Sequence, residues 1–224
     1  MQYVLLAAVL VGLCLAWLAW RQAARMRYIE GFPLQEKLDR RLAARRPELD
    51  AAQRREVFAG LRDYFLICNK AGRRMVAMPS QAVDDAWHEF ILFTRHYRQF
   101  CDRAFGRFLH HTPVEAMRSP TEAGEGLRRA WRLACAHEGI DPKQPARLPR
   151  LFALDAALGI AGGFIYQLDC LAAGGTGRDG YCASHIGCSS GCSGDSGSSD
   201  GGGDSAGGDG GGGCGGGCGG GGGD

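Results

Sequence analysis

Four of the six histidines of this 224-residue chain lie between Val83 and Pro113, and carboxylates accompany them. Asp84 and His88 are separated by one helical turn, so a helix places both side chains on one flank, where they form a two-ligand arm for a metal ion. A borderline transition ion such as zinc accepts imidazole and carboxylate ligands in a roughly tetrahedral array.

Further ligands are available later in the same segment. His110 and His111 follow a helix break at Gly106, and a returning loop brings one of them back to His88. Cys101 offers a thiolate, but the wheel of a straight helix turns it away from His88 and onto the apolar stripe. These spacings predict a metal site made from Asp84, His88 and one of His110 or His111. Cys101 is a further candidate ligand, but its first interpretation is a core residue.

The same cluster has two other interpretations. A carboxylate four positions before a histidine often only fixes the histidine tautomer, which makes a purely structural polar cluster. The other is a zinc-dependent hydrolase in which Asp84, His88 and one of His110 or His111 hold the ion and Glu89 or Asp85 acts as the base.

Motifs of well-known enzyme classes are missing from the sequence. His88 and Glu89 begin an HExxH pattern, but Leu92 occupies the place of its second histidine. The folded part also lacks a Gly-x-Ser-x-Gly elbow, a P-loop lysine motif and a dinucleotide-binding fingerprint. We therefore expect a non-catalytic binding or scaffold protein, with the zinc-dependent hydrolase as the alternative.

Helices must position these side chains. Apolar residues recur at helical spacing, no useful strand alternation occurs, and no repeat of 20 to 50 residues is found. The pattern predicts an all-α fold, a small helical bundle. The expected helices are Leu34 to Arg46, Asp50 to about Lys70, a third and longest from Ser80 through Cys101, Ser119 to Gly139, and Leu148 to Leu158.

The N-terminal segment predicts a membrane anchor. Tyr3 to Trp20 carries no charged residue, and a helix of this length spans about 27 Å, close to the roughly 30 Å of bilayer hydrocarbon. Arg21, Arg25 and Arg27 follow, so the positive-inside bias predicts an N-terminus outside and a cytoplasmic domain. A buried core helix is the alternative.

The C-terminal segment has a different composition. Residues 174–224 contain 25 glycines, five cysteines and a net charge of −5, whereas residues 21–173 carry +7. Such a tail cannot bury enough apolar surface to fold, so we expect residues 1–20 as anchor, 21–173 as helical domain and 174–224 as a disordered Gly/Cys-rich tail. Its cysteines are either occasional oxidation sites or ligands for a soft metal, and a thiol- or metal-sensing tail is a further alternative. No motif favours nucleic acid.

Several short motifs resemble the glycine-rich domain-containing protein-like family. They are D-x-x-W-H at Asp84 to His88, F-C-x4-G at Phe100 to Gly106, F-L-H-H-T-P at Phe108 to Pro113, L-F-A-L-D at Leu151 to Asp155 and Y-x-x-D-C at Tyr166 to Cys170. The resemblance implies that Trp87, His88, Cys101, His110 and His111 belong to one signature. With the topology above, it implies a single-pass protein of the bacterial inner membrane.

Overall fold

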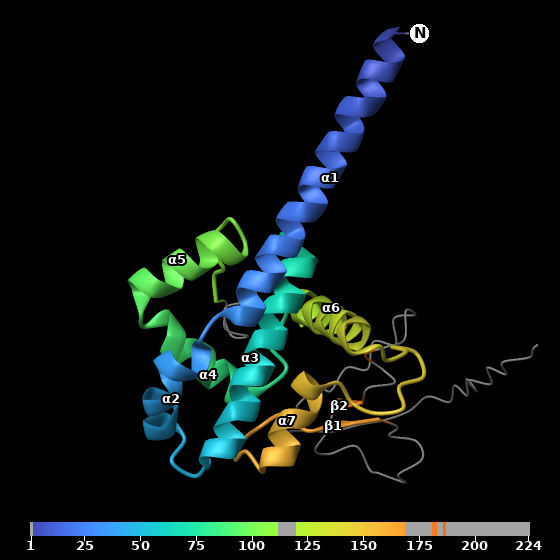
Figure 1. The fold of residues 1–224 in the computed structure, drawn as a ribbon. Coiled ribbons are helices and arrows are strands. Elements are labelled where there is room, and N and C mark those ends of the chain that lie inside the picture. The colour runs from blue at the N-terminus through green and yellow to red at the C-terminus, as the bar shows by residue number, and fades with distance from the viewer. Residues whose placement is uncertain (1, 112–119, 169–180, 183–185, 187–224) are drawn as a thin grey trace, which may run out of the picture. The chain divides into compact units, whose positions relative to one another are not determined.

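The computed structural model describes residues 2–111, 120–168, 181–182 and 186, all within one compact unit that ends at Gly191. These residues form a helical bundle, which confirms the predicted fold class (Figure 1). The elements are α1 (Gln2–Gly31), α2 (Leu34–Arg45), α3 (Ala51–Ala71), α4 (Gln81–Ile91), α5 (Thr94–Ala104), α6 (Pro120–Glu138), α7 (Arg150–Leu158), β1 (Tyr166–Gln167) and β2 (Tyr181–Cys182).

Helix α3 is the centre of the bundle. It lies between α4 on one side and α6 and α7 on the other, and it also contacts α1 and α2 (Figure 1). Asp50 and Gln53 form a capping box at its start, and Gly72 ends it with a φ of 66°. Its apolar stripe, including Leu61 and Phe65, is fully buried. The helix therefore gives the other elements a rigid apolar surface to pack against.

The structure corrects the expected long third helix. The chain turns at Leu92 and Phe93 and divides this helix into α4 and α5. The turn lets α5 fold back, so that Tyr97 and Phe100 pack against Phe90 with ring centroids 5.2 Å apart in each pair. No Gly or Pro marks the turn in the sequence, and the energy that favours it comes from aromatic packing between α4 and α5.

Helix α1 is a candidate membrane span by length and composition, which fits a membrane anchor or a signal sequence. Its residues 2–21 are exposed, and packing on the bundle begins at Gln22, whose side chain donates a hydrogen bond to Asn69 of α3. Ile29, near its end, is fully buried. The same unbroken helix therefore includes both the apolar segment and part of the core.

The two strands are only two residues long and pair in parallel, so they leave the helical class unchanged. The prediction for residues 174–224, including soft-metal binding by the tail cysteines, falls almost entirely outside the described residues.

Candidate metal centre

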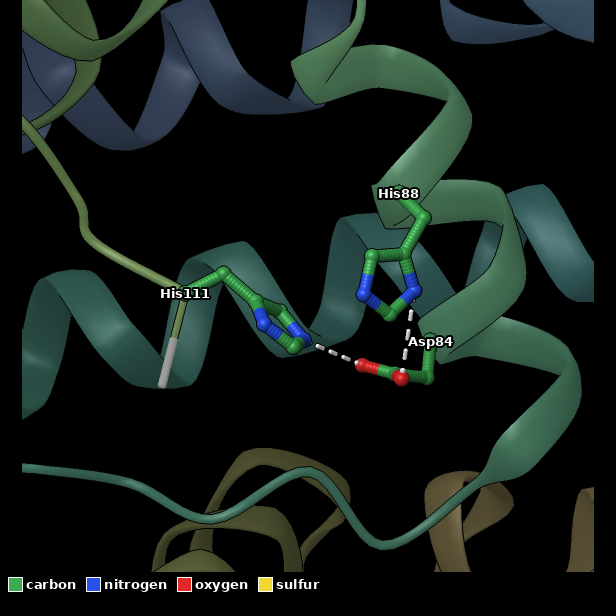
Figure 2. A group of neighbouring side chains, drawn as sticks. All are labelled: Asp84, His88 and His111. Carbon is green, nitrogen blue, oxygen red and sulfur yellow. Dashed lines mark hydrogen bonds and ion pairs between the residues drawn. The ribbon is translucent and has the colours of Figure 1, made fainter. Parts of the chain in front are cut away.

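Three of the predicted ligands meet in space. Asp84 lies at the centre: its Oδ1 is 2.7 Å from Nε2 of His111, and its Oδ2 is 3.3 Å from Nδ1 of His88. The two imidazole rings face the same carboxylate with their centroids 4.3 Å apart (Figure 2). One ligand atom from each residue can be chosen so that all three lie within 4.8 Å of one another.

The start of α4 is held by a residue from another helix. Ser80 caps α4 by accepting a hydrogen bond from the backbone N–H of Val83 at 3.2 Å. The carboxylate of Asp155 on α7, which is 2% exposed, accepts hydrogen bonds from the Ser80 hydroxyl at 2.6 Å and from the backbone N–H groups of Gln81 and Ala82. These bonds fix the first turn of α4, and thus the direction in which Asp84 and His88 project.

A buried hydrogen-bond relay positions His111. The indole N–H of Trp87 donates to the Tyr97 hydroxyl at 3.0 Å, and that hydroxyl donates to the Leu109 carbonyl at 2.5 Å. Burial raises the pKa of the Tyr97 phenol, which therefore keeps its proton and can donate. The His111 ring also packs edge-on against Trp87, with centroids 4.6 Å apart. The relay therefore fixes the segment that returns His111 to α4.

The other two predicted ligands lie outside the three-residue group. His110 is exposed and stacks edge-on against Phe108 at 4.8 Å between centroids. Cys101 is fully buried in the core, and burial raises the pKa of its thiol. That thiol keeps its proton at neutral pH, whereas a metal-binding cysteine must lose it.

The carboxylates proposed as bases for a hydrolase are engaged on another face of α4. Asp85 is 3% exposed and pairs with Arg46 of the loop after α2 at 2.6 Å. Glu89 pairs with Arg41 of α2 at 2.5 Å. Neither residue lines the cavity beside Asp84, so the structure argues against the role in hydrolysis considered for them.

The three ligands fit a zinc ion. The carboxylate oxygens of Asp84 lie 2.7 Å and 3.3 Å from the two imidazole nitrogens, and one ligand atom from each residue can be chosen within 4.8 Å of the others. Tetrahedral zinc with bonds of about 2.0–2.2 Å holds its ligand atoms roughly 3.4 Å apart. Asp84 and His111 lie closer than this because they share a hydrogen bond. An ion would replace that bond, and a small movement of either side chain accommodates it. Three protein ligands also leave a fourth position for a water molecule or another ligand.

A cavity of about 430 Å³ borders this group. Its walls are α4, the loop between α3 and α4, and the segment after α5, and this loop passes below Asp84 in Figure 2. Cys68 of α3 also lines it, but burial raises the pKa of this thiol to about 12, so it is protonated at neutral pH. The imidazoles of His88 and His111 are therefore more suitable ligands than this sulfur.

A second histidine–aspartate contact has a different character. His137 of α6 lies 3.3 Å from Asp63 of α3, and Arg150 of α7 lies 3.3 Å from the other oxygen of the same carboxylate. Burial raises the pKa of Asp63, and the contacts with Arg150 and His137 oppose that shift. The guanidinium of Arg150 already occupies the place that a metal ion would take, so this cluster is a poor metal site. Its contacts instead join three helices.

Sequence reasoning missed the two supports of the site. Tyr97 lies in an apolar pattern, and a buried tyrosine hydroxyl needs a polar partner. Asp155 occurs in an apolar helix, where a lone carboxylate must likewise find donors. Both residues therefore carried a signal that they form buried hydrogen bonds, but the sequence does not identify their partners.

Comparisons with known proteins give a family. The model of the UCP032817-like family matches residues 24–186, from the last third of α1 to just beyond β2. No curated protein and no solved structure matches the chain. The assignment to a glycine-rich domain-containing protein-like family is therefore wrong, because the matching model is a different one. The family description names no activity, so a function has to be inferred from the chemistry of the site. The match covers most of the chain, which belongs to the UCP032817-like family.

Proposed function

We propose that this protein is a membrane-tethered helical binding protein whose Asp84, His88 and His111 hold one zinc ion. The observation that carries the proposal is the convergence of these three side chains beside a cavity. Asp84 and His88 come from adjacent turns of α4, whereas His111 comes from beyond α5. The fold therefore brings two histidines and one carboxylate together from separate elements.

The surroundings of the group support metal binding. The side chains of Asp84 and His111 are 19% and 13% exposed, which shields them from bulk water, while His88 at 46% leaves a path for the ion. Both histidines project from elements fixed by buried hydrogen bonds, namely the Asp155 contacts and the Tyr97 relay. Such outer partners orient ligands and raise metal affinity.

A zinc-dependent hydrolase is a second candidate, and one observation favours it. The fourth zinc position would lie beside a cavity that His110 also lines. His110 then takes the place of Asp85 and Glu89 as the base. Hydrolysis of nitrophenyl esters or phosphates by the zinc-loaded wild type, lost in His110→Ala with zinc retained, would establish this candidate.

Elemental analysis tests the zinc site. The full chain is purified in detergent with the tail cysteines Cys182, Cys188, Cys192, Cys214 and Cys218 replaced by Ser, which removes their competing thiols. We expect one zinc per chain after dialysis, lost in His88→Ala and in His111→Ala. His96→Ala is the matched control, because His96 is exposed on α5 and outside the group.

Cobalt substitution adds a spectroscopic test. Oxygen and nitrogen ligands give weak visible bands, whereas a bound thiolate adds strong charge-transfer absorption in the near ultraviolet. We expect no such absorption, and no change of the spectrum in Cys101→Ala. Zinc retained in both His88→Ala and His111→Ala would overturn the proposal.

The membrane part of the proposal concerns α1. We propose that residues 1–20 are an uncleaved single-pass anchor in a bacterial inner membrane, that residues 21–173 form a cytoplasmic helical domain, and that residues 174–224 form a separate tail. The support is that α1 passes from its apolar segment into the core without a break, so cleavage would cut a helix that helps to hold the bundle.

Cysteine labelling from each side of spheroplasts tests the orientation. The variant is Ala51→Cys, which introduces a thiol at an exposed position at the start of α3, in the chain without tail cysteines. We expect a membrane-impermeant maleimide to label this thiol only after the spheroplasts are lysed. Labelling of intact spheroplasts would overturn the orientation.

A further inference from the structure

We infer that the cavity beside Asp84, His88 and His111 binds a ligand that carries a phosphate monoester. The inference rests on the proposed zinc site, because the fourth position of the ion would hold one phosphate oxygen. It adds a ligand class that the three metal ligands alone do not specify. The argument comes from three arginines in the cavity wall: Arg73, Arg74 and Arg107.

The charge of the cavity wall is strongly positive. Among the described lining residues, Asp84 is the one carboxylate, whereas three arginines line the same cavity. Zinc would add two further positive charges on the same side. Electrostatic focusing in such a cavity favours an anion with more than one negative charge.

These arginines differ from the others around α4. Arg41 and Arg46 each pair with a carboxylate on that helix. Within the described residues, Arg73, Arg74 and Arg107 make no salt bridge. Arg74 donates to the backbone carbonyl of Ala71, and Arg107 donates to those of Gly72 and Phe108. Each still has N–H donors to offer, and planar guanidinium groups match phosphate oxygens in a two-point arrangement.

The rest of the wall suits the organic part of such a ligand. Val76, Met78, Trp87 and Leu109 give it an apolar surface, and the volume of about 430 Å³ lies within the usual range for small-molecule sites. A phosphomonoester would place its phosphate at the arginines and zinc and its organic group against these apolar side chains. Such a ligand accounts for both the charged and the apolar part of the lining.

The position of Arg107 allows two sources of the phosphate. Gly106, the preceding residue, adopts a φ of 67°, and a Cβ there would collide with the guanidinium of Arg25 on α1. The segment that carries Arg107 thus lies against the part of α1 that follows its apolar residues. The ligand is either a free phosphomonoester or the headgroup of a lipid such as phosphatidic acid, and the two arms of the experiment separate them.

In the first arm, calorimetry measures phenylphosphonate binding to the zinc-loaded full chain in detergent. We expect binding that weakens about a hundredfold in the double variant Arg73→Ala/Arg74→Ala, since each lost charged hydrogen bond costs about tenfold. Arg132→Ala is the matched control, because this arginine is exposed on α6 and does not line the cavity. In the second arm, the same proteins are placed in phosphatidylcholine nanodiscs with or without phosphatidic acid whose acyl chain is brominated. The measured quantity is the quenching of tryptophan fluorescence by that chain.

Each outcome is decisive. Arginine-dependent binding of phenylphosphonate supports a free ligand, and arginine-dependent quenching by phosphatidic acid alone supports a lipid headgroup. Zinc binding without either response, or with a response unchanged in Arg73→Ala/Arg74→Ala, overturns this inference and leaves the zinc site standing. Failure to bind zinc overturns both. Urea denaturation, measured in parallel, checks that Arg73→Ala/Arg74→Ala is folded; both substituted positions are exposed.

Discussion

Asp84 and Asp85 are neighbours on α4, yet they lie on faces with different surroundings. Asp85 is buried against the guanidinium of Arg46, with Arg45 3.5 Å from its other oxygen. Asp84 faces two imidazoles and a cavity. Arginine is charged at every physiological pH and holds a carboxylate permanently, whereas a histidine can exchange its proton for a metal ion. The face toward α2 therefore stabilises the fold, and the face toward His111 is available for binding.

The largest effect is expected from a substitution that removes the support shared by both faces of α4. Asp155→Ala deprives the Ser80 hydroxyl and three backbone N–H groups, those of Gln81, Ala82 and Phe164, of their acceptor. We expect a loss of roughly 3 kcal/mol in the free energy of unfolding, because buried donors are left unsatisfied. Urea denaturation followed by circular dichroism measures this. Asp102→Ala, at an exposed site on α5, is the control, and an equal effect of the two would refute the role given to Asp155.

The next largest effect concerns the binding face alone. Asp84→Ala removes the carboxylate that both histidines contact, so we expect zinc affinity to fall at least about a hundredfold. The free energy of unfolding should fall by only about 1 kcal/mol, since His88 keeps access to water and His111 alone loses a partly buried hydrogen bond. Competition with a fluorescent zinc chelator measures the affinity. An affinity within about threefold of the wild type would show that the cluster is a structural contact only.

The reciprocal change is Asp85→Ala. It leaves the guanidinium of Arg46 without its buried partner, which we expect to cost about 2 kcal/mol, less than a fully buried pair because the Arg46 side chain is 16% exposed. Zinc affinity should stay within about twofold of the wild type. Urea denaturation and the chelator assay are run on the same sample. Loss of zinc with unchanged stability would reverse the roles assigned to the two aspartates.

The smallest effect tests the relay behind the binding face. Tyr97→Phe keeps the ring but removes the hydroxyl that joins Trp87 to the Leu109 carbonyl. We expect zinc affinity to fall about tenfold, as for other residues that orient a metal ligand. Tyr28→Phe, on the aromatic cluster of α1, is the matched control. Equal zinc affinities for the two variants would show that His111 is positioned without the relay.

Much of the fold follows from local patterns. The boundaries of α2, α3 and α7 were predicted within two residues, because caps such as Asp50 and Gly72 and the spacing of apolar residues are local properties. The break between α4 and α5 was missed, since it depends on Tyr97 and Phe100 reaching Phe90 after the chain turns. A wheel drawn through residues 88–101 as one helix therefore had no physical basis.

The sequence by itself determined that α4 carries Asp84 and His88 on one flank, because a helix has a fixed turn, and that α1 is apolar enough to span a membrane. Only the tertiary structure decided that His111, and not His110 or Cys101, reaches that flank. It also decided that Asp85 and Glu89 turn to the arginines in and after α2. Such contacts join residues far apart in the chain, and their geometry depends on how the helices pack, which no local pattern encodes.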